Sequence, residues 1–486
     1  MLTERTEKLS ILPPSCPFDV TDVEESENII PADRLFEILL RHVLSYLSIQ
    51  ERWDRAFSVC KRWKTQCVAS LYEESYLDLT WCSGAMASIV QQMDQDADFF
   101  RQHSKLKGVA LAGACITRNI VSGLVKMIAM NLKHVTIESR HVGDDALREL
   151  TGCRRIETLT LHCIRLESTT MVEISKTCPF LRNIDIAGCP YIDDEAILAI
   201  ANNSHRLEQL NIACCYRLSS AAITSIAMRQ SRTLIGLNAD KCMQISGTSV
   251  RQLLEQQPQL THLSCTYCPK ISGRAFHTWQ HLLSPRKSEM GGMHSLCFTG
   301  NLAMDDLGLS TIIKHYHSAL EVLHVGSLPK IGPVSVQSIA QCKFLHTLDI
   351  SRCGTITAND FITIIQSCGP RLTSLNANVC CQLDDQVLVC ISHLCTKLES
   401  ILLEFCYNIT DYGLISLIRG CVYLKSLVLK ACNQLTDASF EYLTQHKAEK
   451  YPIEYLHIGA CMKSDMLVHV IDMVQHRFPN CRINWS

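Results

Sequence analysis

Paired aspartates are the residues of this sequence whose type and spacing first point to chemistry. Two neighbouring carboxylates can share acid–base work in catalysis or bind a cation. The pairs are Asp144-Asp145, Asp193-Asp194, Asp305-Asp306 and Asp384-Asp385. Each pair comes at the same point of a repeating pattern, directly before an apolar segment with helical spacing. We therefore interpret the pairs as helix caps that also favour the helix dipole, and not as catalytic or cation-binding groups.

Closely spaced cysteines are the second group of residues that could do chemistry, because thiolates bind metal ions. The chain has 27 cysteines among 486 residues, and Cys265-x-x-Cys268 has the spacing of half a zinc site. The second pair that a zinc site needs is missing, and Cys268 occupies a position where cysteine recurs along the chain. In Cys214-Cys215 and Cys380-Cys381, one thiol is expected in the core and the other at the start of a turn. We predict no metal site and no other cofactor.

Motifs of catalysis and of nucleic-acid binding are missing from the sequence. It has no P-loop, no dinucleotide-binding glycine motif, no H-E-x-x-H and no G-x-S-x-G. We therefore predict a chain without enzymatic activity of its own. With 46 Lys+Arg against 48 Asp+Glu, the formal charge is −2. That balance speaks against nucleic acid as a partner, because nucleic-acid binding needs a basic face.

Charge and apolar runs predict the compartment. Residues 1–17 carry charges where a signal peptide has its apolar region. No run of 18 or more apolar residues occurs, so no membrane span is expected. We predict reduced thiols and a location in the cytoplasm or the nucleus.

One apolar pattern recurs along most of the chain. It reads L-x-x-L-x-L-x-x-C, with Ile or Val replacing some leucines, and is clearest at 181–189, 345–353, 398–406 and 424–432. Neighbouring cysteines of the pattern lie 26 or 27 residues apart, for example 215 − 189 = 26 and 242 − 215 = 27. Asn301 and Leu328 stand at the cysteine position of two units, and a second cysteine often closes the unit, as at Cys178 and Cys421.

Each unit predicts a short strand, a turn and a helix. The L-x-L alternation directs two side chains inward, and Thr or Asp, as at Thr410, stands where the helix needs an N-cap. The pattern resembles the leucine-rich repeat in its cysteine-containing form. That resemblance implies an α/β fold, namely a horseshoe solenoid with a parallel sheet on its concave face and helices outside. We assign residues 76–486 to this solenoid and count about fifteen units.

The head of the chain lacks the repeat. Residues 1–27 are predicted to be a flexible N-terminal segment, and residues 28–75 a separate helical module. Pro31 suits the first turn of a helix, on which Leu35, Ile38 and Leu39 share one face. We expect three short helices in a small bundle whose apolar face needs a partner or the solenoid to cover it.

The same module resembles an F-box. Ile30-Pro31-Ala32-Asp33, Leu44-Ser45-Tyr46-Leu47 and Val59-Cys60-Lys61-Arg62-Trp63 stand where that family has L-P-x-E, L-S-Y-L and V-C-K-R-W. A few extra residues lie before Leu44, so the match leaves the register of the first helix open. The adaptor-binding residues that the resemblance implies are Pro31, Leu35, Ile38, Leu39, Leu44, Tyr46, Leu47 and Trp63.

An F-box followed by cysteine-type repeats is the order found in substrate receptors of SCF (Skp–cullin–F-box) ubiquitin ligases. The resemblance implies that the F-box binds a Skp-family adaptor and, through it, cullin. The solenoid would then hold a protein target for ubiquitination and proteasomal degradation, by proximity alone. The alternative is a leucine-rich-repeat scaffold or inhibitor outside the ubiquitin pathway, whose head helices only cap the stack.

The strand positions between the leucines predict the target-binding surface. They are polar, small and slightly acidic, which favours a basic target, although each single residue is also compatible with a merely solvated sheet. The substrate-binding candidates are Asp185, Asn211, Asp240, His262, Asp349, Asn376, Glu404 and Lys430. The longest unit (301 − 268 = 33) contains the partly basic insert 284–292, which is either a binding or modification site or tolerated surface variation.

Overall fold

The chain divides into two compact units, residues 1–70 and residues 71–486. Among the described residues, no helix is both long enough and apolar enough to cross a membrane. The computed structural model describes residues 32–56, 58–59, 63, 66–67, 70–71, 74–80, 90, 105–113, 116–229, 232–279, 292–447, 452–461 and 464–485.

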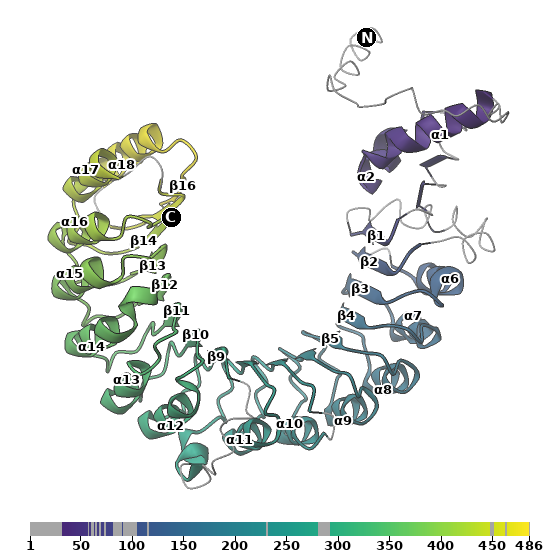
Figure 1. Ribbon diagram of the computed structural model, residues 1–486, viewed down its shortest axis with the longest axis horizontal. Coiled ribbons are helices and arrows are strands. Elements are labelled where there is room, and N and C mark those ends of the chain that lie inside the picture. The colour runs from purple at the N-terminus through teal and green to yellow at the C-terminus, as the bar shows by residue number, and fades with distance from the viewer. Residues whose placement is uncertain are drawn as a thin grey trace, which may run out of the picture. The chain divides into compact units, whose positions relative to one another are not determined.

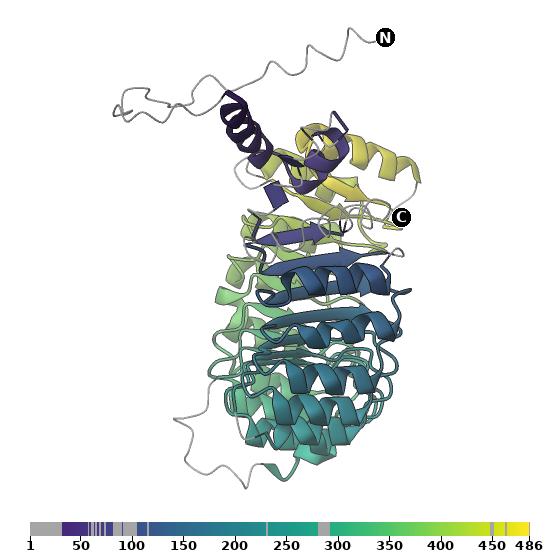
Figure 2. The same ribbon diagram turned by 90° about the vertical axis from the view of Figure 1, so that its right-hand side faces the viewer.

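The second unit is built on one parallel sheet of sixteen strands that are hydrogen-bonded in chain order. The unit curves, with the sheet on the concave side and the helices outside (Figure 1), and the strands stack in successive layers (Figure 2). The strands are β1 Tyr76–Leu79, β2 Gly108–Ala112, β3 His134–Ser139, β4 Thr158–Cys163, β5 Asn183–Asp185, β6 Gln209–Asn211, β7 Gly236–Asn238, β8 His262–Ser264, β9 Ser295–Cys297, β10 Val322–His324, β11 Thr347–Asp349, β12 Ser374–Asn376, β13 Ser400–Leu402, β14 Ser426–Val428, β15 Tyr455–His457 and β16 Arg482–Asn484.

Helices and 3-10 turns (η) return the chain from one strand to the next. This alternation confirms the predicted α/β solenoid. The described helical elements are α6 Arg118–Ile128, α7 Asp144–Arg148, η4 Glu149–Gly152, α8 Ser168–Thr177, α9 Asp194–Asn203, α10 Ser220–Ala227, α11 Gly247–Gln256, η5 Gly273–Phe276, α12 Asp306–Tyr316, α13 Pro333–Ile339, α14 Ala358–Cys368, η8 Gly369–Arg371, α15 Asp385–Leu394, α16 Asp411–Gly420, α17 Asp437–His446 and α18 Ser464–Arg477.

The core lies between the sheet and the helices. In the unit that begins with β11, Leu348 and Ile350 are fully buried, and Phe361 and Ile364 of α14 face them at helical spacing. Leu348 is in register with Leu323 and Leu375 of the adjacent strands, so equivalent side chains stack from unit to unit. The sheet has one strand more than the fifteen units counted in the sequence, because no cysteine turn follows β16.

Thiols of the repeat cysteines link each unit to the one before it. Each Sγ donates to a backbone carbonyl of the preceding unit, as Cys215 does to Ile186 O at 3.2 Å and Cys406 to Ala377 O at 3.3 Å. Burial raises the pKa of the Cys406 thiol to about 11, so the thiol keeps its proton at neutral pH. Asn301 takes the same role with its amide, which donates from Nδ2 to Cys265 O at 2.8 Å. The small buried filler predicted from the sequence is therefore also a hydrogen-bond donor.

A second row of donors follows the ends of the helices. Cys178 Sγ donates to Cys153 O, Cys421 Sγ to Cys395 O, and Lys447 Nζ to Val422 O at 2.7 Å. Burial lowers the pKa of Lys447 to about 8. These contacts satisfy carbonyls that have no partner within their own helix.

The paired aspartates divide their work between two units. Asp193 caps its own helix α9 by accepting the Glu195 N–H, which confirms the predicted cap. Asp194 instead accepts the N–H and the hydroxyl of Ser219, the cap of the next unit. Asp305-Asp306 and Asp384-Asp385 follow the same division. The predicted cap is wrong for Asp144-Asp145, because Gly143 holds the cap position of α7.

The turn before each repeat cysteine uses left-handed backbone. Gly188 and Gly300 have positive φ there, but most units place a residue with a side chain at this position. Val379 has φ +59°, which crowds a β-branched side chain against its own backbone. This position stores local strain.

The first unit has its own small core. Helices α1 (Ala32–Ser45) and α2 (Ile49–Glu51) and the π-helical turn Arg52–Ala56 carry it, and Leu40, Leu44, Ala56 and Cys67 are buried together. The Arg52 guanidinium donates to Leu44 O at 2.7 Å and to Leu47 O at 2.9 Å. This buried cation satisfies the carbonyls at the end of α1.

Replacing Val379 with Asn should stabilise the solenoid by about 1 kcal/mol, because asparagine tolerates the left-handed region and valine does not. Urea denaturation of the full chain measures the change. Arg352→Asn, at the equivalent turn with φ 56° but without β-branching, should give a smaller gain. Destabilisation by Val379→Asn would show that its side-chain contacts outweigh the strain.

Replacing Cys406 with Lys should lower the free energy of unfolding by more than about 3 kcal/mol, because it buries an unpaired charge and removes the donor to Ala377 O. Thermal and urea denaturation measure the loss. Cys381→Lys, at an exposed cysteine, is the matched control and should change stability by less than about 0.5 kcal/mol. Equal stability of the two variants would contradict the buried thiol contact.

Candidate functional site

A hollow of about 440 Å³ lies on the concave side of the solenoid, over strands β4 to β9. Asp185, Asn211 and His262 of the predicted substrate-binding set line it. The other residues around it are Thr158, Thr160, Asn183, Ile184, Gln209, Leu210, Gly236, Leu237, Asn238, Leu263, Ser264 and Ser295. The hollow therefore brings three predicted residues together on one surface.

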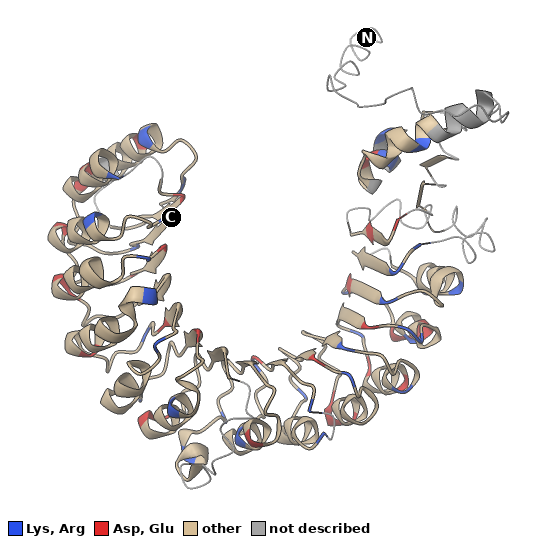
Figure 3. Ribbon diagram, viewed as in Figure 1, with Lys and Arg blue, Asp and Glu red and all other residues tan. Residues whose placement is uncertain are grey.

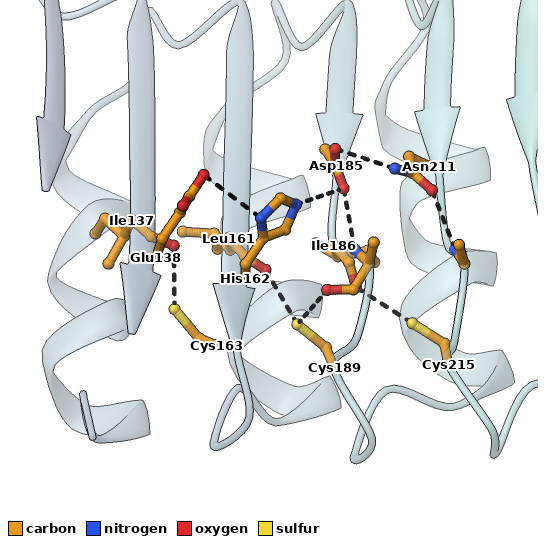
Figure 4. Close-up of polar contacts among 12 residues, drawn as sticks. Ile137, Glu138, Leu161, His162, Cys163, Asp185, Ile186, Cys189, Asn211 and Cys215 are labelled. Carbon is orange, nitrogen blue, oxygen red and sulfur yellow. Dashed lines mark hydrogen bonds and ion pairs between the residues drawn. The ribbon is translucent and has the colours of Figure 1, made fainter. Parts of the chain in front are cut away.

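Asp185 is the centre of a polar network at one end of the hollow (Figure 4). His162 lies between two carboxylates, with Nε2 at 3.0 Å from Asp185 Oδ1 and Nδ1 at 3.6 Å from Glu138 Oε1. Asn211 Nδ2 donates to Asp185 Oδ2 at 3.0 Å, and the Ala187 N–H donates to Asp185 Oδ1 at 3.0 Å. Three neighbouring strands thus hold the carboxylate in one orientation.

The contact between His162 and Asp185 shifts the titration of both groups. The Asp185 carboxylate raises the pKa of His162 above its usual value of 6.5, although burial opposes this. Burial by itself would raise the pKa of Asp185, but His162, the Ala187 N–H and the Asn211 amide lower it below 3.8. The pair therefore adds to stability in full between pH 3.8 and 6.5. The contribution is lost as the pH falls through the lowered pKa of Asp185 or rises through the raised pKa of His162.

The remaining predicted concave residues lie at or beyond the edge of the hollow. Asp240 borders it, since its carboxylate accepts the Ser264 hydroxyl at 2.7 Å. Asp349 on β11 accepts the Ser351 N–H at 2.9 Å, and Asn376 is its neighbour in register on β12. Glu404 lies 3.4 Å from His457 Nδ1. Lys430 comes two residues after the end of β14. These five predicted residues therefore lie along several strands and do not form one cluster.

The predicted adaptor-binding residues fall on different sides of the first unit. Leu39 and Tyr46 are exposed, by 56% and 73%, together with Val43, and all three fall on one helical stripe. Leu44 is fully buried, and Leu47 and Trp63 pack against the same core. The backbone of Leu35 and Ile38 lies in α1. Pro31 and Cys60 to Arg62 lie outside the described residues, as do 284–291 of the insert.

The cysteine pair with zinc-site spacing is engaged in the core. Cys268 Sγ donates to Ala239 O at 3.3 Å, and burial raises the pKa of Cys265 well above its usual range. Within the part of the chain that the structure describes, no three His, Cys, Asp or Glu side chains are grouped to hold a metal ion. The Cys268 thiol acts as a hydrogen-bond donor here, and the Cys265 thiol is buried beside it.

Two residues that shape the site, Gly236 in the hollow and His162 beside Asp185, were not among the sequence-based candidates. Gly236 is in register with Gln209 and His262, and it leaves a gap where the neighbouring strands carry side chains. A Cβ at this position would meet Gln209 Oε1, so the Gln209 side chain leans over the gap. His162, the second residue, lies one unit away from Asp185. The sequence could have revealed Gly236, because a glycine stands there at a strand position where most other units have polar residues. It could not have revealed the contact between His162 and Asp185, because that contact depends on side-chain conformation.

One of the solved structures similar to this chain shares its fold over nearly the whole length. A chain of the yeast Rad7–Elc1 complex is 12% identical, with a TM-score of 0.55, over 94% of this chain and 98% of that chain. An internalin, InlF from Listeria monocytogenes, is 13% identical with a TM-score of 0.40 over 86% of this chain and 96% of its own. The TLR13–ssRNA13 complex contains a chain with 13% identity and a TM-score of 0.38, over 86% of this chain and 62% of that chain. No model of a known protein family matches the sequence.

Replacing Asp185 with Asn should lower the pKa of His162 toward 6.5, because it removes the carboxylate that favours the imidazolium. Titration of the His162 ring by NMR in both proteins measures the shift. Asp349→Asn, which leaves the network intact, should not change it. An unchanged pKa in Asp185→Asn would mean that Glu138 and not Asp185 controls the ring.

Proposed function

We propose that this chain is the substrate-recognition subunit of an SCF-type ubiquitin ligase. The first unit binds a Skp-family adaptor, and through it cullin, while the concave side of the solenoid binds a target protein. The observation that carries the proposal is the match of Val59 to Trp63 to the end of the F-box pattern, in a small helical unit with an exposed apolar stripe.

The exposed stripe of α1 supports adaptor binding. Leu39 and Val43 of α1, with Tyr46 directly after its end, present exposed apolar side chains, while the adjacent side of the helix, at Leu40 and Leu44, is already packed. Amphipathic helices commonly bind partners through such i, i+4, i+7 positions. The yeast Rad7–Elc1 structure supports the proposal only as a complex of two proteins that includes a chain of similar fold.

The concave surface supports target binding. Its hollow is shallow, and ten of its lining residues, such as Asn183, Gln209 and Ser264, have side chains that can donate or accept hydrogen bonds. Such a surface suits a polypeptide, whose main chain and side chains need both kinds of partner. The role requires no catalytic group on this chain, because holding the target near the ubiquitin-charged enzyme raises their effective concentration.

The proposal locates the chain in the cytoplasm or the nucleus. The described cysteines are free thiols, and most of them are buried donors that must stay reduced to act as donors. Degradation of the bound target by the proteasome would follow from its ubiquitination.

Replacing Leu39 or Tyr46 with Asp should weaken adaptor binding at least tenfold, because a charge would be buried in an apolar contact. Calorimetry of the full chain with a purified Skp-family adaptor measures the affinity. Both residues are exposed, so the substitutions should leave the core of the first unit intact. Leu44→Asp would not serve this purpose, since it places a charge inside that core.

Tyr412→Asp is the matched control, because Tyr412 is 67% exposed on helix α16 of the solenoid. It should bind the adaptor like the wild type. Wild-type affinity in both Leu39→Asp and Tyr46→Asp would overturn the assignment of this stripe. No adaptor binding by the wild-type chain would favour the alternative of a scaffold outside the ubiquitin pathway.

A further inference from the structure

The hollow has one strand position, Gly236, without a side chain of its own, and only the flexible end of the Gln209 side chain leans over it. Gly236 stands in register between Gln209 and His262, and the hollow's volume of about 440 Å³ exceeds that of a single side chain. Asp185 and Asn211 border it from β5 and β6, and Asn238 from β7. Acceptor groups from three adjacent strands therefore surround one space.

The Asp185 carboxylate can accept a further hydrogen bond. An ionised carboxylate has about four acceptor sites. Two hydrogen bonds reach Asp185, from the Ala187 N–H and from Asn211 Nδ2, and the His162 ring lies 3.0 Å away as an ion-pair partner. Since these contacts also fix its orientation, a further donor meets a carboxylate that needs no rearrangement.

Lysine and arginine are missing from the concave side of the described strands around the hollow. We define the concave positions as those equivalent to Asn183, Asp185 and Ala187 of β5. In the described strands β1 to β13, no concave position carries Lys or Arg. Figure 3 agrees, since blue lies mainly on helices and on the segments that join helices to strands. Carboxylates at the concave positions are Asp78, Glu138, Asp185, Asp240, Asp349 and Glu404.

We propose that the hollow over Gly236 binds an arginine side chain of an extended segment of the target protein. The guanidinium has five donors in a planar fork and no acceptor. It can therefore contact the Asp185 carboxylate and the amide oxygens around it at the same time, and on the concave positions of β1 to β13 it finds no lysine or arginine and only the His162 ring beside Asp185. This inference rests on the proposed function, because it identifies what the target presents to the concave surface.

The test uses the full chain and a labelled glycine–serine peptide with two adjacent arginines, followed by fluorescence anisotropy. A peptide with glutamine in place of both arginines is the reference and should bind at least tenfold more weakly. Asp185→Asn should weaken binding of the arginine peptide about tenfold, as expected for loss of a charged hydrogen-bond partner.

Asp349→Asn is the matched control for Asp185→Asn. Both aspartates lie on the concave side, both accept the N–H two residues further along the chain, and both substitutions remove one negative charge. Asp349→Asn should change the affinity less than twofold. Equal weakening by the two variants would overturn the site, because it would show only general attraction between a basic peptide and an acidic surface.

Gly236→Val tests the shape of the hollow without changing charge. Its side chain would occupy the gap and displace only the flexible end of Gln209, so the fold should persist, as a thermal denaturation curve checks. Binding of the arginine peptide should fall about tenfold. Unchanged binding by folded Gly236→Val would place the peptide elsewhere and overturn the inference.

Failure of the inference is distinguishable from failure of the proposed function. If the chain binds the Skp-family adaptor but does not prefer the arginine peptide over the glutamine peptide, only the inference is overturned. If adaptor binding is absent while Asp185→Asn and Gly236→Val both weaken the arginine peptide, the hollow is supported and the ligase role is not.

Discussion

A buried carbonyl at the end of each strand must find a hydrogen-bond donor, and the solenoid depends on how that requirement is met. The carbonyl of Ile212 is one of them, and it accepts both the Cys215 N–H of its own turn and the Cys242 thiol of the next unit. The turn's own N–H already pairs this carbonyl, so the thiol adds a second hydrogen bond, between units, worth about 0.5–1.5 kcal/mol net. Cysteine suits the position because its protonated thiol is small, apolar and still a donor. Since the contact repeats from unit to unit, each unit is stabilised by its neighbours and not by itself.

Two units have another residue in place of the repeat cysteine, and they show how the link between units changes without the thiol. Asn301 replaces the thiol with an amide that also accepts the Cys268 N–H, so the unit gains an acceptor contact. Leu328 offers no donor, and Phe298 O accepts the Asn301 N–H of its own turn. The carboxylates of Asp194 and Asp385 add a second link at the helix starts, since each holds the cap residue of the next unit. Backbone contacts of this kind leave the concave side chains free to serve recognition.

Much of this architecture could be predicted because its determinants are local. The L-x-x-L-x-L-x-x-C pattern fixes which side chains turn inward, and Leu348 and Thr410 lie where it places them. Contacts between neighbouring units could not be predicted. The sequence Asp193-Asp194 does not indicate that the first carboxylate caps its own helix and that the second binds the cap residue of the next helix. In the first unit, Leu39 and Leu44 are five positions apart, roughly 140° around a helix, so both cannot share one face. Only the fold shows that Leu44 is the buried one.

The account as a whole holds that a thiol-linked solenoid presents its acidic concave side to a target while a separate helical unit ties it to a ligase. Native mass spectrometry of the full chain mixed with a Skp-family adaptor and cullin tests that claim most directly. The account predicts one complex that contains all three chains in equal amounts. A spectrum in which the adaptor and cullin assemble while this chain stays alone would contradict it.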